Sequence, residues 1–372
     1  MRAFRLPRLH LLTAFAAVLA CSTFALAQDE KKADEKPAEE KKAEEKKADE
    51  KKADEKSSEI KPKTVVTNLD NPTGVIVHPE TGHVFTASRY GIHRYVPGQK
   101  KAKLEVSGYP TDIYGKGPKY NIGPLGVAWL DKDHLIVGDG SRPDGEELVR
   151  IYKIPAEAPE KSQKEDAAAY TLGPIKAGEQ SAMGEGNFYG IAVANNAIFV
   201  TCNGDDTKGW IAKAEVTDGK PGELKPAIAT KELQQTDAPA AITVSPEGEL
   251  VVGQMGEVNV AGDSLILTFD ATSGELKKSY KTGLDDIVGI AYSPKTKKLY
   301  VTEFSWVDPA KGALYRIDFE GDEAKPTKIV DLDKPTGLAF DKDGKLYVCV
   351  FGTGKEGSDK SPGELLLIDA GL

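Results

Sequence analysis

The sequence has few of the residues that most often form disulfides and metal centres. Only three of its 372 residues are cysteines and five are histidines, and no cysteine and histidine combine at the spacing of a zinc site. It contains no G-x-S-x-G motif, which argues against a serine hydrolase. A formal net charge of −9 at pH 7 argues against nucleic acid as a partner, because phosphates require a basic surface.

Long hydrophobic runs are also missing. Residues 1–27 combine a basic start, a short apolar core from Leu11 to Leu19 and an A-x-A site at residues 25–27, which together predict a signal peptide. The apolar core is too short to span a bilayer. We therefore expect an exported protein, periplasmic or extracellular, with no transmembrane span. Lipid anchoring through Cys21 is the less favoured alternative.

Residues 28–63 repeat a KKADE-like phrase and contain a single large apolar residue, Ile60. A segment of this composition cannot bury a core. It predicts a charged low-complexity linker, either disordered or a fluctuating helix. A solvated spacer is the favoured interpretation, and a tail that recruits other molecules is the alternative.

What the chain has in abundance is an internal repeat that fills residues 64–372. The repeat is clearest in KPTGLAFDKDGKLYVCVF, residues 334–351, where two β-rich runs flank an Asp-Gly turn and predict a β-hairpin. Each copy opens on a small residue, and these residues are 52, 64, 51, 48 and 48 positions apart: Gly74, Gly126, Gly190, Ala241, Gly289 and Gly337. A period of roughly 40–50 residues with short strands is typical of a β-propeller.

We therefore predict an all-β fold, a six-bladed β-propeller with four-stranded blades. The last unit lacks a fourth strand, whereas an additional strand over residues 64–69 precedes the first unit. Donation of this N-terminal strand to the last blade would complete that blade and close the ring. Cys202 and Cys349 fall in opposite units, too far apart for a disulfide, so we expect two buried free thiols.

Function is expected on the face that carries the loops before the first strands and between the second and third strands, because these loops are long and rich in polar residues. Aromatic and polar side chains there predict a site for a protein, glycan or small-molecule ligand. The expected ligand-binding residues are Tyr114, Tyr189, Trp210, Trp306, Asp139, Arg142 and Asn203.

Carboxylates on the same face could hold Ca²⁺ through oxygen ligands, and no other cofactor is expected. The candidate metal ligands are Asp205, Asp286 and Glu303. The alternative is that these carboxylates are ordinary turn and surface residues.

The Pro-x-Gly opening of residues 72–74, 124–126 and 335–337 and the hairpin after it resemble the NHL-repeat family and the six-bladed gluconolactonase-like and strictosidine synthase-like propellers. Residues 72–77 and 335–340 carry the resemblance best, and it covers residues 64–372. It implies a six-bladed propeller with a site at the channel mouth. Gluconolactonase-like enzymes take metal ligands from Glu-Gly-Pro and Ser-Asn-Gly-Leu segments, whereas Thr73-Gly74 and Ala240-Ala241 stand at comparable positions here.

Two functions follow as hypotheses. The first is an exported, non-catalytic and monomeric propeller that binds a protein, glycan or small ligand on its loop-rich face. The alternative is a divalent-metal-dependent lactonase or hydrolase of the gluconolactonase-like type, with one carboxylate as general base. The different residues at the expected ligand positions favour the first hypothesis.

Overall fold

The computed structural model describes residues 60–115, 118–205, 207–355, 358–369 and 371–372. The predicted signal peptide and almost all of the predicted linker lie outside these residues, so both stay predictions. The described residues belong to one compact unit, Glu59–Leu372. In this part of the chain, no helix combines the length and the apolar character that crossing a membrane requires.

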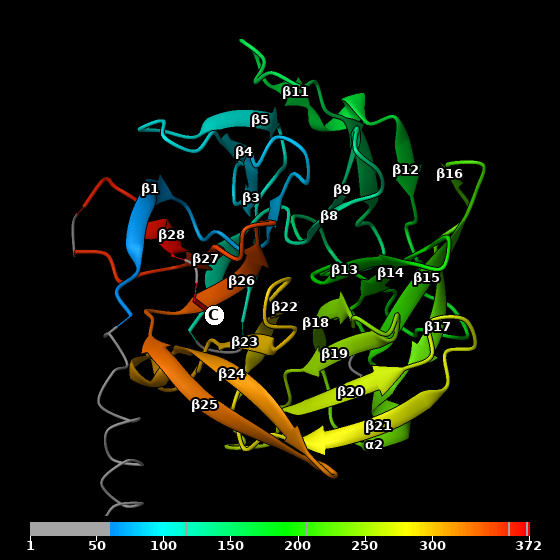
Figure 1. The fold of residues 1–372 in the computed structure, drawn as a ribbon. Coiled ribbons are helices and arrows are strands. Elements are labelled where there is room, and N and C mark those ends of the chain that lie inside the picture. Colours follow the sequence, from blue (N-terminus) through cyan, green and yellow to red (C-terminus); the bar gives the residue numbers. More distant parts are fainter. Residues whose placement is uncertain (1–59, 116–117, 206, 356–357, 370) are drawn as a thin grey trace, which may run out of the picture. The chain divides into compact units, whose positions relative to one another are not determined.

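The described strands pair in successive antiparallel sets of four (Figure 1). The first set is β2 (Val75–Val77), β3 (Val84–Ser88), β4 (Gly91–Tyr95) and β5 (Lys103–Ser107), with β11 (Gln163–Lys164) parallel to β5. The second is β8 (Val127–Trp129), β9 (His134–Gly138), β10 (Val149–Lys153) and β12 (Tyr170–Leu172). The third is β13 (Ile191–Ala194), β14 (Ala197–Thr201), β15 (Trp210–Thr217) and β17 (Lys225–Ala229), with β16 (Lys220–Pro221) beside β15.

The fourth set is β18 (Pro239–Val244), β19 (Leu250–Gln254), β20 (Leu265–Phe269) and β21 (Leu276–Lys281). The fifth is β22 (Ile287–Tyr292), β23 (Leu299–Glu303), β24 (Ala313–Glu320) and β25 (Glu323–Asp331), and β25 also meets β21. The last is β26 (Pro335–Phe340), β27 (Leu346–Val350), β28 (Gly363–Ile368) and β1 (Lys63–Leu69). A separate hairpin joins β6 (Asp112–Tyr114) to β7 (Tyr120–Ile122), and the short helices are η1 (Glu165–Ala167), α2 (Thr230–Gln234) and η2 (Pro309–Lys311).

The first strands of these sets form a closed ring, in which β2, β8, β13, β18, β22 and β26 each contact the next and β26 contacts β2 again. This arrangement confirms the predicted all-β propeller. The sets follow one another around the centre in sequence order (Figure 1). β1 pairs antiparallel with β28, so the N-terminal strand completes the last sheet, as the sequence predicts.

The repeated small residue has a structural reason. A Cβ placed on Gly74 would lie 2.4 Å from the carbonyl oxygen of Leu125 in the next unit, and one on Gly190 would lie 2.3 Å from that of Ala240. At Gly337 the clash would be with the Thr73 oxygen, at 2.5 Å, across the seam of the ring. The ring of first strands is therefore tight because glycine lets neighbouring backbones touch.

The core consists of apolar layers between successive sheets. One layer, for example, joins Ile136 and Ile151 of the second set to Ile198 and Val200 of the third. Both described cysteines are buried and unpaired in such layers, as predicted, and burial raises the thiol pKa of Cys202 and Cys349.

Candidate functional site

The residues just before the repeated small residues meet on the axis of the ring. They line a small cavity of about 60 Å³, and they are Thr73, Leu125, Tyr189, Ala240, Val288 and Thr336. The two threonine hydroxyls donate to backbone oxygens, Thr73 to Leu125 at 2.9 Å and Thr336 to Pro72 at 2.7 Å. The described residues that line this axial position are therefore mainly apolar, and no carboxylate is among them.

An aromatic cluster covers the axial cavity on the loop-rich face. The β6–β7 hairpin places the Tyr114 and Tyr120 rings 5.7 and 5.4 Å from the Trp306 ring. Phe304 lies 5.0 Å from Trp306, and Phe351 lies 5.2 Å from Tyr120. The Trp306 indole also donates to the Pro118 oxygen at 3.2 Å. The hairpin and the loop after β23 thus close the mouth of the channel together.

Beside this aromatic cluster lies a cleft of about 490 Å³, formed by loops of the second, third and fourth sets and by the β6–β7 hairpin. Tyr114 and Trp306 form one wall, and the amides of Asn187 and Asn203 form part of another. This volume falls in the range of small-molecule sites, and the mixture of aromatic and polar groups is typical of them.

The charge of the cleft has one sign. Its carboxylates are Asp112, Asp144, Asp237 and Glu257, and no lysine, arginine or histidine is among the described residues that line it. Asp237 accepts a hydrogen bond from Lys231 at 2.6 Å, a residue from outside the lining. A cleft of this kind repels anions and accepts hydrogen bonds from hydroxyl or amino groups.

Two carboxyl groups meet behind the cleft wall. Oε2 of Glu147 and Oδ1 of Asp144 lie 1.7 and 2.6 Å from the position that a Cβ on Gly186 would take. Glu147 is fully buried, and its Oε2 accepts from the backbone N–H of Asn187. Burial, followed by the nearby charges of Asp139 and Asp144, raises the pKa of Glu147 to about 9, against the opposing effect of the Asn187 N–H. Glu147 is therefore a neutral acid at pH 7, beside a carboxylate that faces the cleft.

Asp286 holds the Trp306 wall in place. Its Oδ2 accepts from the Trp306 backbone N–H at 2.6 Å, and the residue is 1% exposed. Burial, followed by the charges of Asp285 and Glu303, raises the pKa of Asp286 to about 6. Glu303 is also buried and accepts from the Asp285 N–H at 3.0 Å.

The structure gathers four of the predicted ligand-binding residues and separates three. Three of the four line both the cleft and the axial cavity, namely Tyr114, Asn203 and Trp306. Tyr189 lines only the axial cavity. The other three lie elsewhere and do not line the cleft, namely Trp210, Asp139 and Arg142.

All three side chains are held by contacts elsewhere in the fold. Trp210 is packed in the layer between the second and third sets, and its indole donates to the Gln180 oxygen at 3.0 Å. Asp139 is fully buried and pairs with Arg142 at 2.5 Å and with Arg150 at 3.0 Å. These groups already have partners within the fold.

The predicted metal ligands do not converge either. Asp205 organises its own turn, accepting from the Thr207 N–H at 3.0 Å and the Met183 N–H at 3.2 Å, whereas Asp286 and Glu303 lie between the fourth and fifth sets. Within the described residues, no three histidine, cysteine, aspartate or glutamate side chains form a group that could hold a metal ion.

The sequence did not point to the carboxyl pair of Asp144 and Glu147, nor to Met183 and Asn187 as residues that line the cleft. Asp144 lies in a loop between the second and third strands of its unit, on the face where function is expected, whereas the sequence around Glu147 is typical of a surface segment. Met183 and Asn187 precede the third repeat, where a Gly-Glu-Gly segment was the one local signal of a close backbone approach.

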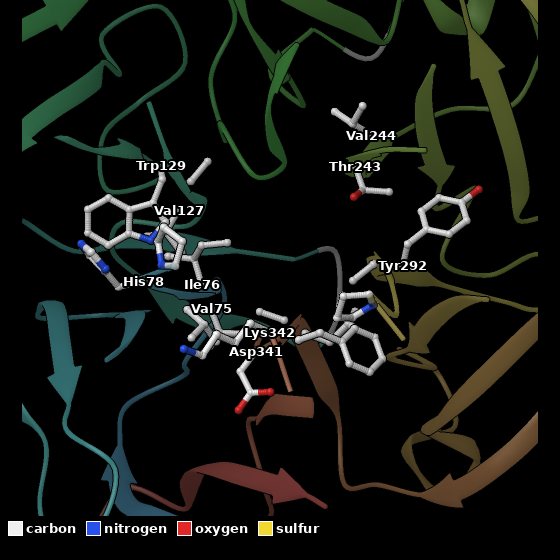
Figure 2. A pocket seen from close by; sticks show the side chains of 18 of the residues that line it. Val75, Ile76, His78, Val127, Trp129, Thr243, Val244, Tyr292, Asp341 and Lys342 are labelled. Atoms are coloured by element: carbon white, nitrogen blue, oxygen red, sulfur yellow. The ribbon is translucent and has the colours of Figure 1, made fainter. Parts of the chain in front are cut away.

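The opposite face opens into a funnel of about 760 Å³ along the axis. Figure 2 shows side chains of its wall and rim, among them Val75, Val127 and Trp129. The wall strands are each the end strand of their described sheet, so their free edges expose backbone groups that need hydrogen-bond partners. Water suits such a wall better than a dry apolar ligand, and the cleft on the loop-rich face is the stronger candidate.

A comparison of sequences places residues 170–365 in the family described as SMP-30/Gluconolactonase/LRE-like region. The chain belongs to this family. No curated protein sequence matches the chain.

Solved structures share the fold. A glucose dehydrogenase matches with a TM-score of 0.56 and 14% identity over 84% of this chain and 100% of that chain. The PQQ-bound aldose sugar dehydrogenase of Streptomyces coelicolor matches with a TM-score of 0.57 and 15% identity, over 83% of this chain and 97% of that chain. The apo form of the soluble aldose sugar dehydrogenase of Escherichia coli matches with a TM-score of 0.55 and 15% identity, over 83% of this chain and 99% of that chain. At these identities the likeness shows the propeller fold alone.

The metal that the family resemblance implies does not fit this chain at the expected place. Thr73 and Ala240 stand at the comparable positions, and both line the small apolar cavity beneath the aromatic cluster. The Thr73 hydroxyl already donates to the Leu125 oxygen. Neither residue offers the charged oxygen that Ca²⁺ prefers.

Proposed function

We propose that this chain is a hydrolase of the gluconolactonase-like type that acts on a small, neutral, polyhydroxylated substrate, a sugar-derived lactone, in the cleft on the loop-rich face. The observation that carries the proposal is the composition of that cleft. It combines two aromatic side chains, two amides and four carboxylates with no cationic side chain among its described lining residues.

Each part of this composition suits a sugar. Tyr114 and Trp306 offer aromatic surface to the apolar face of a sugar ring. Carboxylates accept hydrogen bonds from hydroxyl groups, and Asn187 and Asn203 can both donate and accept. An anionic ligand would meet several carboxylates among the described lining residues, which is unfavourable at short range in a partly desolvated site.

PQQ, which is bound in one similar structure, does not fit this donor set. The molecule carries three carboxyl groups, and the described lining of the cleft provides no arginine, lysine or histidine to neutralise them. We therefore derive no redox step for this chain. The charge of the cleft also favours release of the product, because lactone hydrolysis converts a neutral substrate into a carboxylate.

The carboxyl pair supplies the chemistry in this proposal. An ionised Asp144 takes a proton from a water molecule as the water oxygen bonds to the lactone carbonyl carbon. The bond from that carbon to the ring oxygen then breaks, and Asp144 returns the proton to the departing oxygen, which gives an open-chain hydroxy acid. The Asn187 amide, 3.4 Å from Asp144 Oδ1, orients the carboxylate.

Glu147 acts as a positioning residue. Because burial keeps it protonated at neutral pH, it adds no second negative charge next to Asp144. Its contact with the Asn187 N–H also fixes the segment that carries the amide. Replacement of Glu147 is expected to change the pH profile of the reaction more strongly than it changes the affinity for substrate.

The test is the rate of D-glucono-1,5-lactone hydrolysis at constant pH, with the spontaneous rate subtracted. We expect Asp144→Asn to lower kcat by about 100-fold or more, in the range of general-base losses, and EDTA to have no effect. Glu146→Gln, an exposed neighbour outside the cleft, is the matched control and is expected to keep the wild-type rate. Equal rates for wild type and Asp144→Asn would refute the catalytic role.

A non-catalytic binding propeller is the second candidate, and one observation favours it. The positions where gluconolactonase-like enzymes hold metal ligands are occupied by Thr73 and Ala240. If the protein binds neutral sugars in the cleft but does not accelerate lactone hydrolysis above the spontaneous rate, this second function is the correct one. In either case we propose that the protein acts outside the cytoplasm, because residues 1–27 have the pattern of a signal peptide.

A further inference from the structure

Part of the rim of the cleft is formed by apolar side chains that are unusually open to solvent. Met183 is 66% exposed and Ile113 is 61% exposed, and both line the cleft together with the half-buried Val258. They come from three separate places in the chain: the segment before β13, strand β6 and the loop between β19 and β20. Single exposed apolar residues are normal on a protein surface, but convergence around one cleft indicates a binding surface.

The methionines strengthen this observation. The sequence contains three, of which Met1 is the initiator. The other two, Met183 and Met255, both line the cleft. Methionine is flexible and polarizable, and it suits surfaces that must adapt to an apolar ligand of variable shape. Met255 is buried, whereas Met183 is largely exposed to solvent.

The backbone beneath Met183 is held in place. Its N–H donates to Asp205 Oδ2 at 3.2 Å, and Asp205 also accepts from the N–H of Thr207. The side chain is therefore presented at the rim by an anchored segment. On the other side, Ile113 belongs to β6, which pairs with β7 through Asn121.

We propose that the substrate is amphiphilic, with a neutral polyhydroxylated head group against the carboxylates of the cleft and an apolar substituent that lies across Met183 and Ile113. This inference rests on the proposed function and specifies its substrate class as alkyl-, acyl- or aryl-substituted sugar derivatives. The head group supplies hydrogen bonds to the cleft, and the substituent covers side chains that are otherwise exposed to water.

The expected gain in affinity can be bounded. Full burial of one methylene contributes about 0.8 kcal/mol, which is roughly a fourfold change in Kd. An alkyl chain on an open rim is buried on one side only, so we expect a preference of tenfold or more for an octyl over a methyl substituent, well below the full-burial limit.

The experiment compares methyl and octyl β-D-glucopyranoside by calorimetric titration of the full chain, with the octyl compound kept below its micelle-forming concentration. The variants are Met183→Gln and Ile113→Gln. The matched control is Val307→Gln, because Val307 is 67% exposed but does not line the cleft. We expect the octyl preference to fall at least threefold in each rim variant and to persist in Val307→Gln.

The outcomes separate this inference from the proposed function. Equal affinity for the two glucosides would overturn the amphiphilic substrate and leave the sugar site intact. A loss of octyl preference in Val307→Gln as large as in the rim variants would also overturn it, because the alkyl chain would then adsorb without a defined site. If neither glucoside binds, the proposed function fails and this inference fails with it.

Discussion

Replacement of Glu147 by glutamine tests the buried carboxyl pair through the stability of the fold. Glutamine has the shape of the protonated carboxyl group but cannot ionise. Glu147 is fully buried, and its pKa of about 9 in the folded protein lies far above the ordinary value of 4.5. Between these two values the folded chain keeps a proton that the unfolded chain has lost.

The sign of the effect follows from proton linkage. Where the unfolded state binds fewer protons than the folded state, the free energy of unfolding falls as pH rises, by about 1.4 kcal/mol per pH unit for one proton. From pH 6 to pH 8 the wild type should therefore lose roughly 2.7 kcal/mol through Glu147. The free energy of unfolding of Glu147→Gln should fall by about that much less over the same range, because glutamine cannot ionise. Burial also raises the pKa of Glu185 to about 7, but this residue contributes equally to both proteins.

The assay is urea unfolding of both proteins at pH 6 and pH 8, with Glu146→Gln as the exposed control. We expect the wild type and the control to show the same loss of stability with pH, and Glu147→Gln to show a shallower one. Identical pH dependence in all three proteins would contradict a buried, protonated Glu147. The proposed carboxyl pair would then have no basis.

Three further predictions concern the fold. Arg94 and Glu105 form a buried ion pair at 2.9 Å, so Arg94→Met should lower the free energy of unfolding by about 3–5 kcal/mol because it leaves Glu105 unpaired. Chemical denaturation measures this loss, and recovery of stability in the double variant Arg94→Met/Glu105→Leu would support the explanation. Val66 of β1 is 5% exposed at the seam, and Val66→Asp should lower stability by about 3 kcal/mol or more, whereas an unchanged melting temperature would argue against closure through β1. Cys202 and Cys349 should resist alkylation in the native protein and react in urea, as peptide mass spectrometry would show, because burial raises their thiol pKa.

The sequence predicts the fold well because the fold repeats. Each unit opens on a small residue, and the structure shows that a Cβ at Gly74 or Gly190 would strike the carbonyl of the next unit. The unpaired strand at the start and the missing strand at the end predict the β1–β28 pairing. Both features follow from local sequence and from the need to leave no open sheet edge.

The site is less accessible to sequence reasoning, since it depends on where loops bring side chains. Tyr114 and Trp306 are aromatic residues in long predicted loops, which is why the sequence points to them, and both line the cleft. Trp210 has the same character, but it begins β15 and packs into the core. The carboxyl groups of Asp144 and Glu147 both occupy the space beside Gly186, which lies in a different loop and has no Cβ, and no local pattern reveals this contact.

The cleft should select a neutral polyhydroxylated ligand and reject an anionic one. The most direct measurement is a tryptophan fluorescence titration with methyl β-D-glucopyranoside and with D-gluconate, with Trp306→Phe as a check that the signal comes from the cleft. We expect saturable quenching by the glucoside, no saturation with gluconate, and loss of the signal in the variant. Binding of gluconate as tight as that of the glucoside would contradict this selectivity.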